Sequence, residues 1–557
     1  MILKNIIRYA IFALIAVFLF MFLLMPIYLV VSEGVKLSYI GEVFSNKLYI
    51  DGIINSLLIA VVTTLITLLI AFPLVLIFDK YNFCGKKWTS FLIMLPMILP
   101  PFVGALGIQQ LLGYYGVFNS LLINHFGVER IDFLGGENRF FWVCITEALH
   151  LYPILYLNLI SALGGIDPTL DEAAKNLGAS KWRRFFSITL LLAKNGIFAG
   201  CSIILIWSFT ELGTPLMFGF NRTMPVQIFN GLTELESNPL PYTLVSLMLV
   251  FSAVLYGIVK FIFRTDEAII SKGVSAGREE KVHGIGKLLP IGCFLIVALV
   301  SILPHIALIL TAFGRGFYQR IVPASFTLAH FEEALSNKLV VPSIVNSLEY
   351  SLLATLIALF IGFMGAYIVI KWRLRGGIWL DILCMLPLAV PGIVIAFGYI
   401  GMSNEFLFAK KYLNPALNPF LLLGVAYAIR RIPYVIRSAA SGLLQTPDDL
   451  EAAARNLGAG EFSTLCKITL PLILSNLIVG GLFAFSFSML EVSDSLILAQ
   501  KQEYYPITKA LFELSQFLGE GPDIACAFGV WTMAFLASTL FGASILAHKK
   551  ISSVFKL

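Results

Sequence analysis

Long apolar runs separated by short polar segments recur along the whole chain. Most of these runs approach the roughly 20 residues that a helix needs to cross the hydrocarbon core of a bilayer. Backbone groups in lipid have to be satisfied within their own segment, so the runs are expected to be helices. The pattern predicts an all-α polytopic membrane protein with about twelve transmembrane helices. The predicted spans are 10–31, 53–78, 89–112, 140–163, 194–217, 241–263, 288–312, 345–370, 378–401, 420–442, 472–498 and 524–547.

Basic residues gather at alternate ends of these runs. Lys4 and Arg8 precede the first run, Lys371 follows the eighth, and Lys549 and Lys550 lie near the end of the chain. With twelve spans all of these residues lie on one side of the membrane, which the positive-inside rule assigns to the cytoplasm. The sequence therefore predicts a multi-pass protein with both termini in the cytoplasm.

The composition agrees with a membrane protein that has no nucleic-acid partner. Hydrophobic residues make up 58% of the chain and charged residues 13%, against about 25% charged residues in soluble domains. The net charge of +6 is small for 557 residues, and it fits basic loops beside a lipid bilayer better than a nucleic-acid surface. The seven cysteines form no Cys-x-x-Cys pair, so no metal site is expected from them.

Short sequences recur at constant distances and divide the chain into two halves. Asn55-Ser56-Leu57 returns 291 positions later as Asn346-Ser347-Leu348, and Gly178 has a counterpart 280 positions later in Gly458. Six spans per half is an even number, so the halves share one orientation and are parallel-related, with a pseudo-twofold axis along the membrane normal. The predicted halves are 1–263 and 288–557, joined by a cytoplasmic linker at 264–287. A duplicated bundle without a solute pathway is the alternative.

A polar loop occurs once in each half, at about 168–191 and about 447–471. One copy contains Glu172-Ala173-Ala174 and the other Glu451-Ala452-Ala453-Ala454. Alanine and leucine favour helix, acidic residues at the start oppose the positive end of the helix dipole, and the glycine permits a sharp turn. Each loop is therefore expected to be a short helix–turn–helix on the cytoplasmic face.

These loops resemble the Glu-Ala-Ala (EAA) loop of ABC importer permeases. The first copy matches at Glu172, Ala173, Ala174, Gly178, Ile188 and Leu190, and has Leu191 where proline is usual. The second copy matches at Ala453, Ala454, Gly458, Ile468, Leu470 and Pro471, and has Ala452 at the glutamate position, with Glu451 one residue earlier. In that family the loop is a coupling helix that fits a groove on a nucleotide-binding subunit. The resemblance assigns this role to Asp171, Glu172, Ala173, Ala174, Gly178, Trp182, Glu451, Ala453, Ala454, Gly458 and Phe462. Ordinary interfacial helices are the alternative interpretation.

The chain has no Gly-x-x-x-x-Gly-Lys-Ser/Thr phosphate loop, so it is not expected to hydrolyse ATP by that chemistry or to be an enzyme. The resemblance implies that ATP and Mg²⁺ bind to a separate cytoplasmic subunit, present in two copies. It also implies an extracytoplasmic substrate-binding protein and a place in the bacterial cytoplasmic (inner) membrane. We expect no cofactor and no metal on this chain.

Ionisable residues and prolines inside the spans are candidates for a translocation path. Charged groups at membrane depth are costly and indicate function, and prolines break helices where the backbone lines a cavity. The candidates are Glu211, Glu491, Asp494, Pro96, Pro100, Pro387 and Pro391. Packing pairs and packing kinks are the alternatives. His150 and Glu147 in the first half occupy repeat positions similar to those of Arg430 and Arg431 in the second half. For the arginines, snorkelling or structural pairing is the favoured interpretation.

A single chain with two permease halves is most similar to the ferric iron importer permeases, a resemblance also carried by Leu386-Pro387-Leu388-Ala389-Val390-Pro391-Gly392. Related fused permeases that import thiamine or 2-aminoethylphosphonate stay open as alternatives. A secondary transporter with six plus six helices is the rival from another class, and it would need neither an ATPase nor doubled coupling loops.

Overall fold

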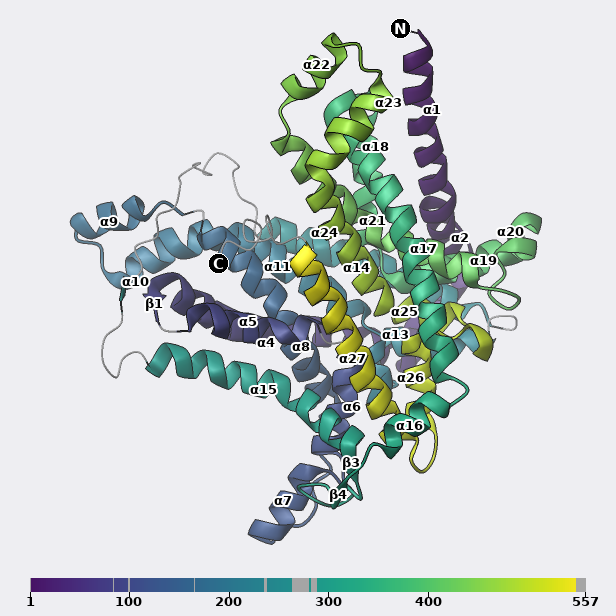
Figure 1. The fold of residues 1–557 in the computed structure, drawn as a ribbon. Coiled ribbons are helices and arrows are strands. Elements are labelled where there is room, and N and C mark those ends of the chain that lie inside the picture. The colour runs from purple at the N-terminus through teal and green to yellow at the C-terminus, as the bar shows by residue number, and fades with distance from the viewer. Residues whose placement is uncertain are drawn as a thin grey trace. The chain divides into compact units, whose positions relative to one another are not determined.

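The protein is described by a computed structural model that covers residues 2–546 except 84, 99–100, 165, 235–237, 263–279 and 282–287. Helices dominate this part of the chain (Figure 1). Four short strands form two pairs, a parallel pair of β1 with β2 and an antiparallel pair of β3 with β4. Apart from residues 280–281, the predicted linker lies outside the described residues, as do Pro100, Lys549 and Lys550.

The elements of the first part of the chain are α1 Ile2–Leu19, a π-helical turn Phe20–Leu24, α2 Met25–Gly34, α3 Leu37–Ser45, α4 Lys47–Lys80, β1 Tyr81–Asn82, α5 Lys86–Ile98, α6 Pro101–Leu112, α7 Val117–Phe126, α8 Asn138–Leu163, α9 Pro168–Asn176, α10 Lys181–Arg184, a π-helical turn Phe185–Thr189, α11 Leu190–Thr210, α12 Gly213–Met217, α13 Met224–Asn230, a 3₁₀ turn Gly231–Glu234 and α14 Leu240–Ile262.

The elements of the second part are β2 Glu280–Lys281, α15 Leu288–Phe313, β3 Gly314–Arg315, β4 Ser325–Phe326, α16 Ala329–Ser336, α17 Val340–Tyr367, a π-helical turn Ile368–Trp372, α18 Gly377–Met385, a 3₁₀ turn Leu386–Leu388, α19 Gly392–Glu405, α20 Leu407–Tyr412, α21 Phe420–Gln445, α22 Asp448–Asn456, α23 Glu461–Thr464, a π-helical turn Leu465–Thr469, α24 Leu470–Met489, α25 Ser493–Leu498, a 3₁₀ turn Gln502–Tyr504, α26 Ile507–Gln516 and α27 Gly521–Leu546.

The all-α polytopic prediction is confirmed, and the structure refines the number of spans. Eight helices of the described part are long and apolar enough to cross a membrane, or up to ten if each of two bent pairs is one span. The pair Gly377–Leu388 and Gly392–Glu405 is bent by 103°, where Pro387 and Pro391 interrupt the helix. At the predicted span 420–442 lies α21, a continuous helix that carries three arginines, and α27 occupies the predicted span 524–547.

The helices form two compact units, each built from both halves of the sequence. One unit comprises Met1–Ser45, Ile228–Leu249 and Phe331–Leu557, and the other comprises Asn46–Gln227 and Val250–His330. We call them unit 1 and unit 2. Helices α1 to α3 therefore belong with the second half of the sequence, and α15 belongs with the first. The predicted halves 1–263 and 288–557 rest on sequence repetition alone and remain a prediction.

Close backbone contacts pack these helices against the half of the sequence to which they do not belong. In unit 1 the Tyr399 hydroxyl of α19 donates to the Phe22 carbonyl at 2.7 Å, and a Cβ on Gly398 would lie 2.4 Å from the Pro26 carbonyl oxygen. In unit 2 a Cβ on Gly107 of α6 would lie 1.8 Å from the Pro304 carbonyl oxygen of α15. Only glycine permits such approaches.

The repeated Asn-Ser-Leu sequence forms equivalent hydrogen bonds in both units. Asn55 donates to the Arg222 carbonyl at 2.9 Å, and Asn346 donates to the Glu503 carbonyl at 2.9 Å. The hydroxyl of the following serine then accepts the first backbone N–H of a helix, Met224 of α13 in unit 2 and Ile507 of α26 in unit 1. Backbone N–H groups in the first turn of a helix have no acceptor within the helix and need one elsewhere. The repeated serine supplies this acceptor in both units, so the repeat corresponds to a shared local structure.

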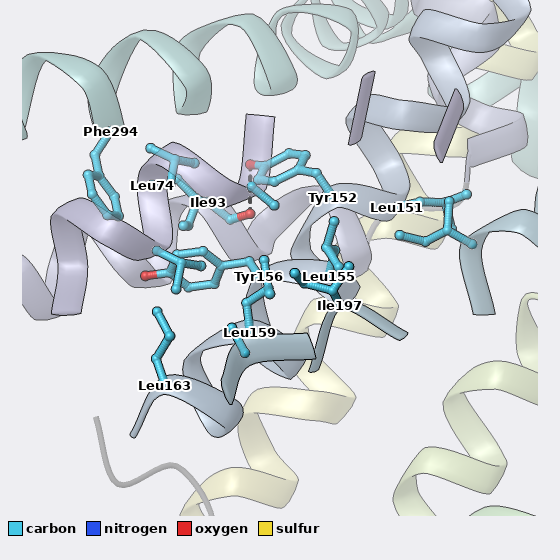
Figure 2. Packing of buried hydrophobic residues seen from close by; sticks show 14 of the residues in the cluster. Leu74, Ile93, Leu151, Tyr152, Leu155, Tyr156, Leu159, Leu163, Ile197 and Phe294 are labelled. Carbon is cyan, nitrogen blue, oxygen red and sulfur yellow. Dashed lines mark hydrogen bonds between the residues drawn. The ribbon is translucent and has the colours of Figure 1, made fainter. Parts of the chain in front are cut away.

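The core of unit 2 packs aromatic and aliphatic side chains of α4, α5, α8, α11 and α15 (Figure 2). Tyr152 and Tyr156 of α8 are fully buried at its centre. The Tyr152 hydroxyl donates to the Ile93 carbonyl at 2.7 Å, and the Tyr156 hydroxyl lies 3.2 Å from the Ser90 hydroxyl. Buried tyrosines need such partners, and here they tie α8 to α5.

Two glycines one turn apart let α11 approach α8 closely. A Cβ on Gly196 would lie 2.7 Å from the Asn158 carbonyl oxygen, and one on Gly200 would lie 2.4 Å from a Leu155 methyl. Without a hydrophobic force between helices in lipid, association depends on this kind of close van der Waals packing.

We predict that Gly196→Val lowers the stability of the purified protein by about 1–3 kcal/mol, because the added side chain overpacks the contact between α11 and α8. The measurement is thermal unfolding in detergent. Gly257→Val in α14 is the matched control, since a Cβ there meets nothing within 4 Å. Equal unfolding temperatures for the two variants would contradict the close approach.

Candidate functional site

The second polar loop is a helix–turn–helix, as its sequence predicts. Helix α22 begins after Pro447 and has Asp448, Asp449 and Glu451 in its first turn, where carboxylates stabilise the helix start. Gly458 follows with a φ of 88°, a left-handed conformation that glycine adopts without strain. Helix α23 then leads through a π-helical turn into α24.

The first polar loop repeats this construction in unit 2. The Asp167 carboxylate accepts the Thr169 backbone N–H at 2.9 Å at the start of α9, and this bond lowers the pKa of Asp167. Gly178 makes the turn with a φ of 81°. The Ser180 hydroxyl accepts the Arg183 N–H at 3.3 Å and caps α10. Both loops therefore present the same backbone.

Each loop exposes large apolar side chains at matched positions. Leu177 and Leu457 follow the first short helix and are 88% and 89% exposed, and Trp182 and Phe462 of the second are 73% and 79% exposed. Ala173 and Ala453 are exposed beside them. Exposed leucine and aromatic side chains on a polar loop are typical of a protein-binding surface.

A carboxylate at a matched position fixes the first short helix of each loop. Glu451 is buried, and its two oxygens accept from the Thr469 hydroxyl at 2.8 Å and from Arg455 at 3.0 Å. Asp171, at the matched position 280 residues earlier, forms an ion pair with Arg184. Glu172 and its counterpart Ala452 are both exposed. The anchoring position thus lies one residue before the glutamate of the family motif.

Basic residues predicted for one side of the membrane meet at the second loop. Arg8 of α1 forms an ion pair with Glu461 of α23, and its guanidinium lies 5.5 Å from the centre of the Trp372 ring. Lys371 donates to Asp448 at 2.6 Å, and this bond and charge lower the pKa of the Asp448 carboxyl. The end of unit 1 that carries the loop is therefore tied to α1 and to the π-helical turn that follows α17.

Further along the same unit, four ionisable side chains meet in a buried cluster. Arg430 and Arg431 of α21 both form ion pairs with Glu491, and Arg430 lies 3.7 Å from the Asp494 carboxylate. Arg431 also donates to the Phe487 carbonyl at 2.8 Å. Glu491 and Asp494 are buried, so the arginines pair inside the protein and do not snorkel. The four formal charges cancel.

The break before α19 makes room for this cluster. Pro387 and Pro391 are buried on either side of the break, and Gly392 begins α19. A Cβ on Gly392 would lie 2.3 Å from Nη1 of Arg430. The glycine after the second proline therefore admits the guanidinium.

In the equivalent region of unit 2, His150 and Leu151 stand at the positions matched to Arg430 and Arg431. Glu147 of α8 is buried and accepts a hydrogen bond from the Ser208 hydroxyl of α11. Glu211 accepts the Gly213 N–H at 3.1 Å. His150 donates through Nδ1 to the carbonyl of Pro96 at 2.8 Å, near the bend in this unit. Glu147, His150, Leu151, Trp207, Ser208 and Glu211 line a small cavity.

The geometry adds residues that the sequence analysis did not select. Thr469, Arg184 and Gly392 act as partners of selected side chains, and the repeat distance of 280 between Asp171 and Glu451 was the available signal for the anchoring position. Within the described ranges, no group of three or more histidine, cysteine, aspartate or glutamate side chains is arranged to hold a metal ion.

Comparison with known proteins places the chain among membrane transport components. The family described as "Binding-protein-dependent transport system inner membrane component" matches twice, over residues 76–265 and 358–545. A Haemophilus influenzae protein with the provisional name ferric transport system permease protein is 27% identical over 482 residues, which are 83% of this chain and 71% of that protein.

Two further relatives carry similar names. The ferric transport system permease protein of Actinobacillus pleuropneumoniae is 26% identical over 479 residues, 83% of this chain and 65% of its own length. A Fe(3+)-transport system permease protein of Haemophilus influenzae is 25% identical over 450 residues, 80% of each chain.

We predict that Glu451→Ala loosens the second loop by about 1–3 kcal/mol, because it leaves the buried Thr469 hydroxyl without its acceptor. Hydrogen exchange of the α22 amides measures the effect, and faster exchange is expected. Ala452→Gln, at the exposed neighbouring position, is the control and should leave the exchange unchanged. Unchanged exchange in Glu451→Ala would show that Glu451 does not anchor the loop.

A second prediction concerns the buried cluster. Glu491→Gln should lower stability by about 3–5 kcal/mol, because removing one partner leaves the buried Arg431 and the partly buried Arg430 poorly compensated. Glu211→Gln at the matched position of unit 2 should cost much less, since Glu211 is only partly buried whereas Glu491 is buried. Chemical unfolding of the two variants measures the difference, and equal losses would contradict the asymmetry.

Proposed function

The chain belongs to the family of binding-protein-dependent transport system inner membrane components, and from this premise we propose that it is the permease subunit of an ATP-binding cassette importer for ferric iron. The family match covers a segment of each half, in agreement with a fused pair of permease modules. Proteins of this family are multi-span membrane components of importers, and we propose the bacterial inner membrane with both termini in the cytoplasm as the location.

The observation that carries the proposal is the pair of matched polar loops. A transporter driven by two ATP-binding subunits needs two similar docking points, and the loops present Leu177 with Trp182 and Leu457 with Phe462 on the same backbone. We propose that these loops, from Asp171 to Trp182 and from Glu451 to Phe462, contact two copies of a cytoplasmic ATP-binding subunit. A secondary transporter would have no use for such a pair.

Anchoring explains how a loop of this kind transmits force. Glu451 accepts from the Thr469 hydroxyl just before α24, and Asp171 pairs with Arg184 of α10 and so ties the two short helices of the first loop to each other. A push on the second loop therefore reaches α24 with little slack, and the first loop moves as one piece at the start of α11. Buried hydrogen bonds to charged groups contribute about 1.5–3 kcal/mol each. We propose that ATP-driven closure of the partner subunits moves these two helices.

The substrate proposal rests on the relatives. All three relatives described above are named for ferric iron, and we therefore propose ferric iron over thiamine or 2-aminoethylphosphonate. An extracytoplasmic binding protein would deliver the iron, since the family name refers to such a protein. Within the membrane, Glu211 and Pro96 of unit 2 remain proposals for the path, whereas Glu491 and Asp494 form a compensated cluster with two arginines.

The test is ⁵⁵Fe uptake by bacteria that lack their own copy of the gene and express the chain with its ATP-binding subunit and binding protein. Leu177→Asp and Leu457→Asp should each weaken docking of the ATP-binding subunit by about 30-fold, since a central interface side chain contributes about 2 kcal/mol. Uptake should fall accordingly, and co-purification of the ATP-binding subunit measures docking directly.

Leu518→Asp is the control, because Leu518 is fully exposed but lies outside both loops. It should leave uptake and co-purification unchanged. Uptake that continues without ATP, or that survives both loop variants together, would rule out the proposed mechanism. Uptake of another solute with the loops still required would correct only the substrate.

A further inference from the structure

A groove of about 670 Å³ opens in unit 2, near the first turns of α4 and α8. Its walls come from these two helices, the turn before α8 and the loop between α12 and α13. The volume falls within the range of about 300–1,000 Å³ that is typical of small-molecule sites. The first polar loop follows the other end of α8, so the groove lies on the membrane side opposite to the proposed ATP-binding subunits. The residues on which the argument depends are Asn55, Leu58, Glu137, Arg139, Phe141 and Arg222.

Two arginines give the groove a positive charge. Arg139 is half-buried and is held by two backbone carbonyls, since Nε donates to Leu134 at 2.7 Å and Nη1 donates to Gly219 at 2.8 Å. A guanidinium has five N–H donors, so three of them are left for a ligand. Arg222 is exposed, and neither arginine forms an ion pair within the described ranges. The two arginines and Glu137 give the lining a net charge of +1.

The apolar part of the groove lies at membrane depth. Helices α4 and α8 are both long and apolar enough to cross a membrane. Leu58 is 47% exposed and Phe141 is 60% exposed, and they lie inside the predicted spans 53–78 and 140–163. Leu58 is five residues beyond the start of its predicted span, which is about 7.5 Å along a helix. An occupant of the groove therefore has to enter the hydrocarbon region, which a soluble protein does not.

The matched region of unit 1 carries the opposite charge. At the repeat distance of 291 residues, Leu58 corresponds to Glu349. The repeated asparagine donates to the carbonyl of Arg222 in unit 2 and to the carbonyl of Glu503 in unit 1. Both glutamates are exposed. The same local backbone thus presents a leucine and an arginine in unit 2 and two carboxylates in unit 1, and the carboxylates would repel an anion.

We propose that the groove of unit 2 binds an anionic phospholipid, with its phosphate on Arg139 and Arg222 and an acyl chain against Leu58 and Phe141. Arginine is well suited to phosphate because its planar fork of donors binds two oxygens at once. A phospholipid combines this charge with an apolar chain at the depth where the groove lies. The bound lipid joins the start of α8 to the loop before α13. The inference goes beyond the proposed function and requires only that the chain spans a membrane.

Native mass spectrometry of the purified full-length protein with added lipid tests the site. Phosphatidylglycerol is anionic, and phosphatidylcholine with the same acyl chains is zwitterionic. We expect one tightly bound phosphatidylglycerol, preferred over phosphatidylcholine by about 25-fold, because each arginine near a charged headgroup contributes about 5-fold. Arg139→Gln and Arg222→Gln should each lower this preference about 5-fold. Leu58→Gln should weaken both lipids to the same extent, because the chain contact does not depend on the headgroup.

Lys501→Gln is the control, since it removes a basic residue from the matched loop of unit 1, between α25 and α26. It should bind phosphatidylglycerol like the wild type. Arg139 also donates to two carbonyls, so if Arg139→Gln does not fold, Arg222→Gln carries the test. An unchanged lipid preference in the arginine variants would overturn the proposal, as would equal binding of the two lipids by the wild type.

Two further outcomes would assign the groove to another ligand and would also overturn the proposal. If soluble glycerol 3-phosphate displaces phosphatidylglycerol as effectively as the lipid itself, the arginines form a site for free phosphate compounds. If the arginine variants keep the lipid but no longer dock a binding protein, the groove is a protein interface. In each of these cases ⁵⁵Fe uptake by the wild type would leave the proposed importer standing.

Discussion

The constraint on which this structure depends is the cost of charge and unsatisfied hydrogen-bonding groups inside a membrane-embedded bundle. Most of the chain meets it with uninterrupted apolar helices. Where charges do enter, unit 1 pairs them, so that Arg430, Arg431, Glu491 and Asp494 form a cluster with no net formal charge. The break at Pro387 and Pro391 and the glycine that follows it make this cluster possible, since the guanidinium of Arg430 fills the space beside Gly392.

The same constraint shapes the polar loops. They lie at the ends of long helices, where exposed leucine and aromatic side chains are available to a soluble partner. A loop that only covered a helix end would have no need of a buried anchor. The buried Glu451, bonded to Thr469 and Arg455, instead makes the second loop a stiff extension of α24, and the Asp171 pair with Arg184 holds the two short helices of the first loop together. This stiffness is what coupling to an ATP-driven partner requires.

Several features could be predicted from residues alone because their physics is local. Apolar runs of the right length indicate helices, acidic residues and glycines indicate the start and turn of each loop, and prolines indicate the break before α19. The anchoring carboxylates could not be recognised in this way. Asp171 and Glu451 look like ordinary first-turn acids, and only their partners 13 and 18 residues away show their structural role.

The sequence by itself determined the class of the protein, the doubled loops and the repeat distances, because hydropathy, turn-forming residues and repeated motifs can be recognised from residues that are close together in the sequence. Only the tertiary structure decided which helices pack together. It placed α1 to α3 with the second half and α15 with the first, and it paired Glu491 with two arginines while leaving Glu147 without one. The physical reason is that packing and charge compensation depend on close approach between segments that are distant in the sequence. Glycines and helix breaks permit such an approach, but their positions in the sequence do not show which segments will meet.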